Sequence, residues 1–177
     1  MLYQFKVAVS IITVFLLGFF FSVASAMEKP LACKGKLTVV DGTVNTINTS
    51  STQQSGQINI VLSPLGGGAP IFAENGMILG EVQKQLRIQT LLNHHIEFAS
   101  GGIKTENDVA ILKMPPIGFE VDGTPCAFGV FESIYNISGT GLFDKAKALI
   151  TAEGTVSFCS YNNQNNFTLN GVICLDG

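Results

Sequence analysis

Short segments in which polar and apolar residues alternate dominate the chain after residue 35. Residues 57–62, 85–89 and 95–98 alternate polar and apolar residues, with Val61 the one exception, which is the period of a strand with one buried face. Further strand-like segments are 36–40, 109–114, 127–137, 155–161 and 167–174. No stretch combines helical periodicity with capping residues, and residues 143–150 come closest to a helix. The sequence therefore predicts an all-β protein.

Many short strands separated by Gly, Asn, Asp and Pro are typical of barrels and sandwiches. We expect an antiparallel β-barrel of about eight strands, stabilised by disulfides, with a β-sandwich as the alternative. Asp41-Gly42 predicts a turn, and the Thr-, Ser-, Asn- and Gln-rich residues 45–56 predict a mobile loop. Residues 65–70 predict a second irregular segment.

The first 26 residues have the pattern of a secretory signal peptide. Lys6 precedes an uncharged run, residues 7–26, that is rich in Ile, Val, Leu and Phe and ends in Ala24-Ser25-Ala26. A basic start, an apolar middle and a small-x-small end are the three parts of such a signal. We expect cleavage after Ala26, a secreted or periplasmic location, and a single exported all-β domain over residues 27–177.

Two other interpretations of the N-terminal region remain. Residues 7–26 are close to the ~20 residues that span a bilayer as a helix, so an uncleaved membrane anchor is the alternative. Lipidation of Cys33 is a weaker one. Glu28, Lys29 and Pro30 separate that cysteine from the apolar core, which a lipid-attachment cysteine should follow directly.

The four cysteines all lie beyond the signal, and an even number in an exported chain predicts two disulfides. Cys159–Cys174 is the least favoured pairing. If residues 161–166 are a hairpin turn, the cross-strand neighbour of Cys159 is near Leu169. We favour Cys33–Cys174, which joins the first strand to the last, together with Cys126–Cys159.

Charge and ligand spacing exclude several classes of function. Removing the leader, with its single lysine, makes the net charge one unit more negative than the −3 of the whole chain. Arg87 is the only arginine and there is no basic cluster, which disfavours nucleic-acid binding. No zinc-ligand spacing is present, so we expect no metal and no cofactor.

Candidate acid–base residues are few. His94 and His95 are the only histidines, and neighbours on a strand point to opposite faces, so at most one can face a cavity. There is no G-x-S-x-G turn, and we expect a strand-end histidine in solvent. Glu120 and Asp122 would share one face of a strand and are expected to face water. We therefore assign no catalytic residue and lean towards a protein that is not an enzyme.

Two other local patterns have plain interpretations. Residues 66–68 are three glycines, but no helix with a phosphate-binding N-terminus is predicted to follow, so they indicate a flexible turn. Glycosylation sequons occur at Asn48, Asn136 and Asn166. They matter only in a host that glycosylates exported proteins.

The most specific segment is residues 137–148, ISGTGLFDKAKA. Its glycines permit a tight turn after a strand, its phenylalanine is placed to plug a core, and its first alanine leaves room for close packing. It resembles the G-T-G-x-F-x-x-A-x-G signature of dirigent proteins, allene oxide cyclases and similar exported bacterial proteins. The matching residues are Gly139, Thr140, Gly141, Phe143 and Ala146.

The match has two departures. Leu142 stands where dirigent proteins usually have Arg, and Ala148 stands where Gly is usual. The resemblance implies an eight-stranded antiparallel barrel with an apolar cavity, often in a homo-oligomer. The catalytic residues of those enzymes have no counterpart by motif in this chain, so the resemblance carries over the architecture and not the activity.

Three functions follow from these observations, and none assigns ligand-binding residues. The first is a non-catalytic barrel that binds a small apolar ligand, because an eight-stranded barrel can hold one. The second is a secreted or surface module that binds an exported protein partner, such as an inhibitor, effector or adhesion accessory. The third is a cyclase- or isomerase-type enzyme, which would need a paired acid and base in a cavity.

Overall fold

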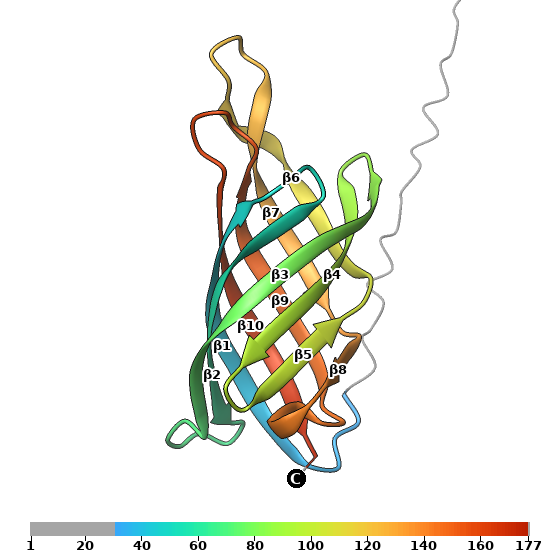
Figure 1. Ribbon diagram of the computed structural model, residues 1–177. Helices are drawn as coiled ribbons and strands as arrows, with labels where there is room; N and C mark the ends of the chain where they lie inside the picture. The colour runs from blue at the N-terminus through green and yellow to red at the C-terminus, as the bar shows by residue number, and fades with distance from the viewer. Residues whose placement is uncertain (1–30, 177) are drawn as a thin grey trace, which may run out of the picture.

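The sheet of this protein closes on itself. The structure, a computed structural model, describes residues 31–176 (Figure 1). The predicted leader and its cleavage after Ala26 lie outside the described residues. Within them, every strand pairing is antiparallel, and no helix is long and apolar enough to cross a membrane.

Ten strands and one short 3-10 helix make up the described chain. They are β1 (Lys36–Asn48), β2 (Gln53–Pro64), β3 (Phe72–Leu86), β4 (Gln89–Phe98), β5 (Gly101–Thr105), β6 (Asp108–Phe119), β7 (Pro125–Ile134), β8 (Ile137–Gly139), η1 (Gly141–Phe143), β9 (Lys147–Ser157) and β10 (Gln164–Leu175).

Eight of the strands form a closed ring. Their order is β3-β2-β1-β10-β9-β7-β6-β4, and β3 pairs with β4 to complete it. The two remaining strands, β5 and β8, extend the sheet beside β4 at one end of the ring. The prediction of an all-β, antiparallel barrel of about eight strands is confirmed. A sandwich, the alternative, would leave two separate sheets.

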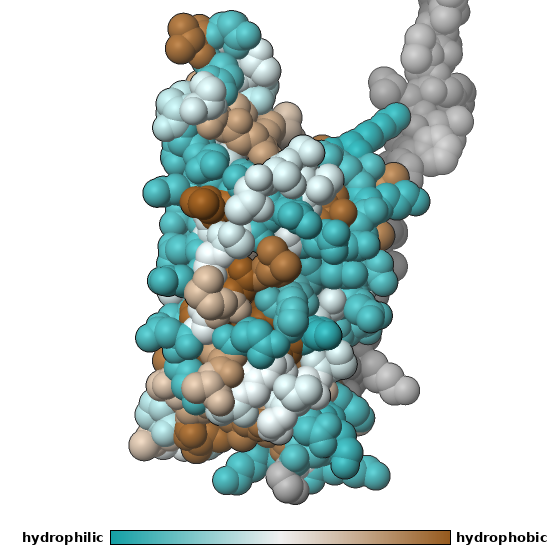
Figure 2. Space-filling view, viewed as in Figure 1, coloured by the Kyte–Doolittle hydropathy of each residue, from teal (hydrophilic) through white to brown (hydrophobic). Residues whose placement is uncertain are grey.

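The alternation seen in the sequence points one face of each strand into the ring. In β1, Val40 and Val44 are buried while Asp41 and Thr43 between them are exposed. The same period runs through β2, where Ile58, Ile60 and Leu62 face the interior. Burial of the apolar set stabilises the fold by roughly 25 cal/mol per Å² removed from water. Polar side chains cover much of the outer face (Figure 2).

Three phenylalanines plug the ring at the end near the C-terminus. Phe143 is fully buried, with its ring centroid 5.5 Å from that of Phe72 and 5.6 Å from that of Phe98. Phe143 reaches this place through the turn after β8. Gly141 has φ +59°, a left-handed conformation that favours glycine, and a Cβ on Gly139 would lie 2.4 Å from the Phe143 carbonyl oxygen.

Two disulfides join distant parts of the chain. Cys33–Cys174 ties the segment before β1 to the end of β10, and Cys126–Cys159 ties the start of β7 to the loop after β9. These are the pairs favoured from the sequence. The reasoning that excluded Cys159–Cys174 placed the turn too late, because β9 ends at Ser157 and Cys159 forms an isolated bridge with Asn162.

Two local expectations were wrong. Asp41-Gly42 is not a turn, because both residues lie in the middle of β1 and pair with β2 and β10. Residues 45–56 are not one loop but the end of β1, a short turn between Asn48 and Gln53, and the start of β2. In each case cross-strand pairing overrides a local signal. Residues 65–70 do lie outside any strand, as expected.

We predict that Phe143→Ala destabilises the protein by about 3–5 kcal/mol, because it empties the centre of the aromatic plug. Chemical denaturation followed by circular dichroism measures this. Leu142→Ala, at the neighbouring 40% exposed side chain, is the control and should cost less than about 1 kcal/mol. Equal effects of the two substitutions would contradict the assignment of Phe143 as the plug.

Candidate functional site

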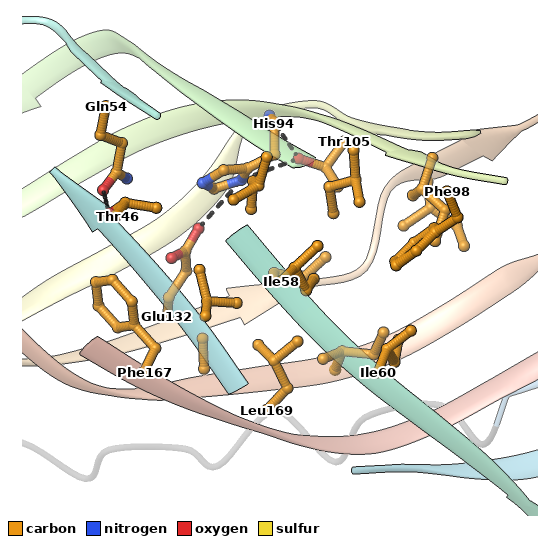
Figure 3. Close-up of a pocket in the computed structure, with 18 residues that line it drawn as sticks. Thr46, Gln54, Ile58, Ile60, His94, Phe98, Thr105, Glu132, Phe167 and Leu169 are labelled. Carbon is orange, nitrogen blue, oxygen red and sulfur yellow. Dashed lines mark hydrogen bonds and ion pairs between the residues drawn. The ribbon is translucent and has the colours of Figure 1, made fainter. Parts of the chain in front are cut away.

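Two cavities lie inside the ring. The larger, the upper cavity, has a volume of about 290 Å³ and lies at the end of the ring that carries the turn between β1 and β2. The smaller, of about 50 Å³, is the lower cavity. Gln54, Glu132 and Phe167 line both, so these three side chains separate them (Figure 3).

Aliphatic and aromatic side chains make up the walls of the upper cavity. They are Val82, Leu92, Ala110, Leu112, Val130, Val156, Phe158 and Phe167. Short polar residues of the β1–β2 turn, among them Ser50, Ser51 and Thr52, line it as well. Glu132 is the only charged side chain that lines this cavity within the described chain.

His94 is the centre of a buried polar cluster beside the lower cavity. Its Nδ1 lies 2.8 Å from Oδ2 of Asp108, 3.3 Å from Oγ1 of Thr105 and 3.6 Å from Oε1 of Glu132. His94 is 7% exposed, Asp108 1% and Glu132 5%. With Nδ1–H donated to Asp108, Nε2 is left as the free nitrogen of the neutral ring.

A break between β5 and β6 brings Thr105 and Asp108 together. Residues three apart on a continuous strand would face opposite sides of the sheet. Glu106 and Asn107 interrupt the strand, and Asn107 takes the left-handed conformation with φ +57°. Both Thr105 and Asp108 therefore face the interior, where the Thr105 hydroxyl donates to Oδ2 of Asp108.

Charge and burial compete in setting the pKa values of this cluster. Burial lowers the pKa of His94, but the charge of Glu132 and the hydrogen bond and charge of Asp108 together outweigh it, so the pKa is raised above 6.5. Burial also raises the pKa of Glu132 above 4.5, and the Asp108 charge adds to that effect, while His94 opposes it.

Glu132 is the least satisfied member of the cluster. Its carboxyl accepts no hydrogen bond from any described residue, and its nearest partner is His94 Nδ1, 3.6 Å from Oε1; Oδ1 of Asp108 is likewise buried without a hydrogen bond. A buried carboxyl without a hydrogen-bond partner costs free energy unless it is protonated or paired. Glu132 therefore has unused capacity to accept a hydrogen bond or pair with a cation.

A second polar cluster faces the first across the ring, and it is well satisfied. Nδ2 of Asn165, a fully buried residue, lies 3.1 Å from Oγ1 of Thr46 and 3.0 Å from Oδ1 of Asn48. The Thr46 hydroxyl donates to Oε1 of Gln54 at 2.8 Å. Hydrogen bonds hold this side of the cavity floor in one arrangement.

The two neighbouring histidines of β4 lie on opposite faces of the sheet, as strand alternation requires. His95 is exposed and its Nε2 lies 2.5 Å from Oε1 of Glu97. For His94 the expectation of a solvent-exposed histidine was wrong, because its register on β4 points it inward.

Glu120 and Asp122 lie in or beside the β6–β7 turn, where Glu120 accepts hydrogen bonds from Ser160 and Asp122 accepts one from the backbone N–H of Thr124. They form no acid–base pair in a cavity.

Among the sequons, only Asn48 has its side chain committed to hydrogen bonds, donating to the Ser157 carbonyl at 2.6 Å. Asn136 and Asn166 are exposed.

Sequence reasoning missed Asp108 and Glu132. Glu132 could have been found, because it has the same parity as Val130 and Ile134 on an apolar strand and so must face inward. Asp108 could not, because its inward direction depends on the break at Glu106 and Asn107.

No family model, curated protein or solved structure matches the sequence of this chain or its fold, so no residue is assigned a role by similarity to a known protein.

We predict that the free energy of unfolding falls as pH rises from about 5. Both raised pKa values mean that the folded state holds protons which the unfolded chain releases, so stability is full at low pH and is lost as pH rises through the folded pKa values. The slope is at most about 1.4 kcal/mol per pH unit for each proton. Urea denaturation from pH 4.5 to 9 measures it.

Glu132→Gln should flatten this decline, because it removes one titrating group and the charge that raises the pKa of His94. The matched control is Glu97→Gln, at the exposed Glu–His pair on the outer side of β4, since exposed ion pairs contribute little to stability. An unchanged slope in Glu132→Gln would contradict the pKa assignment.

Proposed function

We propose that this protein is an exported, non-catalytic barrel that binds a small, mainly apolar ligand in the upper cavity. The observation that carries the proposal is the cavity itself, about 290 Å³ in volume, with apolar walls and one charged group. Ligand sites are typically concave and apolar, with a few polar groups that fix orientation. The volume is at the small end of the usual range of about 300–1,000 Å³, which suits a small ligand.

Two features support the remaining parts of the proposal. Two disulfides fit an oxidising compartment, in agreement with a secreted or periplasmic location. The resemblance of residues 139–146 to dirigent proteins and allene oxide cyclases stays a prediction, and it too would place a ligand inside a barrel.

A protein-binding module is the second candidate, and one surface feature favours it. The hairpin between β6 and β7 projects from the ring, with hydrophobic colour at its tip (Figures 1 and 2). Met114, Ile117, Phe119 and Val121 of this hairpin are exposed. Exposed apolar patches are common at protein interfaces.

The enzyme hypothesis keeps support from the cluster around His94. A cyclase or isomerase needs a paired acid and base in a cavity, and His94 and Glu132 both line the lower cavity. We rank it third because this cavity is only about 50 Å³, too small for a substrate beside the two groups.

We predict that the protein binds N-phenyl-1-naphthylamine, a neutral apolar dye, with increased fluorescence. Ala110→Leu should weaken binding at least tenfold, because the added atoms fill the upper cavity from β6. Ala73→Leu, an exposed position on β3, is the control and should bind as the native protein does. Native mass spectrometry of the isolated protein provides a second readout. Failure of both assays to show any bound small molecule would refute the proposal.

A further inference from the structure

We infer that the ligand of the upper cavity carries a protonated amine, which pairs with the carboxylate of Glu132 at the cavity floor. This inference rests on the proposed function and adds the chemical class of the ligand's head group.

The first argument is the position of Glu132. It lines both cavities, so it lies where the apolar walls of the upper cavity end. A ligand whose apolar body fills the upper cavity would bring its inner end to this carboxyl. No lysine or arginine lines either cavity among the described residues, so the protein itself supplies no cation there apart from His94.

The second argument is the charge balance of the buried cluster. Asp108 and Glu132 are two carboxyls, and His94 is the one basic group near them. When all three are ionised, one negative charge is left uncompensated inside the protein. Buried charges are costly unless paired. A ligand cation at Glu132 would complete the pairing, whereas a ligand carboxylate would add a second unpaired negative charge.

The third argument is that His94 is already committed. Its Nδ1 is hydrogen bonded to Asp108 at 2.8 Å, and Thr105 also donates to that carboxylate. Glu132 accepts no hydrogen bond from the described residues. Oδ1 of Asp108 also lacks a hydrogen-bond partner, but Asp108 does not line the upper cavity, so Glu132 offers the acceptors that a ligand there can reach.

A metal ion is a less suitable cation for this cluster. Donor atoms of His94, Asp108 and Glu132 lie within 4.8 Å of one another, but Nδ1 and Oδ2 are in direct hydrogen-bond contact. Tetrahedral zinc, with ligand bonds of about 2.0–2.1 Å, would hold such atoms about 3.3 Å apart. The cluster would have to open, whereas an amine entering from the upper cavity leaves it intact.

The test compares three ligands with the same chain and different head groups: octylamine, octanol and octanoate. Isothermal titration calorimetry with the disulfide-bonded protein at pH 8 measures each directly, and displacement of N-phenyl-1-naphthylamine provides a second measurement. We expect octylamine to bind at least tenfold more tightly than octanol, and octanoate to bind most weakly. Equal affinities for octylamine and octanol would overturn the inference.

Glu132→Gln keeps the shape of the side chain and removes its charge. It should abolish the preference for octylamine over octanol. Glu97→Gln, the exposed carboxyl on β4, should keep the preference. Dye binding without an amine preference would leave the proposed function standing and refute the head group alone. Absence of dye binding, together with no bound small molecule in native mass spectrometry, would refute the cavity proposal and the head group with it.

The pH dependence is a readout on the native protein that does not depend on the variant folding. The titratable groups facing Glu132 are His94 from β4 and Asp108 from β6, while the neighbours from β2, β9 and β10, namely Gln54, Ala152 and Phe167, are uncharged. Octylamine must displace a proton from Glu132, so its affinity should rise as pH rises from 5 to 8. The affinity of octanol should stay flat over that range.

Zinc chloride alone is the final arm of the experiment. Stoichiometric binding of zinc, lost in Glu132→Gln, together with no binding of octylamine, would mean that the missing cation is a metal and would overturn the inference. Weak binding of zinc beside tight binding of octylamine would support it.

Discussion

Pairing of β1 with β10 is the interaction on which the rest of the structure depends. It joins the first strand to the last along twelve residue pairs, from Lys36 with Leu175 to Ile47 with Gln164, and Cys33–Cys174 lies at one end of it. Without this pairing the sheet would have two free edges and no enclosed interior. With it, every inward-facing residue of eight strands borders one shared space.

The size of the inward-facing side chains differs between the two ends of this interior space. At the lower end the phenylalanine plug fills it, whereas at the upper end smaller side chains such as Ala110 and Val130 leave a cavity. The polar groups lie between these two regions. The filled lower end makes the fold rigid. In our proposal the upper cavity holds the ligand, and the carboxyl of Glu132, which accepts no hydrogen bond, lies at its inner end.

The cluster at the floor has opposite consequences for stability and for binding. Burial of Glu132 beside Asp108 raises the pKa of Glu132 and makes its ionised form costly in the folded protein. The same cost makes the carboxylate a strong partner for a cation that arrives with an apolar body. In our proposal, the group that weakens the fold at high pH is also the group that selects the ligand.

The sequence by itself determined the all-β class and predicted two disulfides, because alternation and cysteine count are local or compositional properties. It favoured an eight-stranded barrel and the observed cysteine pairs but left a sandwich open, and only the pairing of β3 with β4 decided the closure. It also required His94 and His95 to face opposite sides. Only the tertiary structure decided which of them is buried, since that depends on the register of β4 in the ring. It likewise decided that Asp41-Gly42 continues a strand, because pairing on both sides outweighs the turn preference of two residues. The meeting of His94, Thr105, Asp108 and Glu132 depends on a strand break and on three different strand pairings, and no local pattern carries that information.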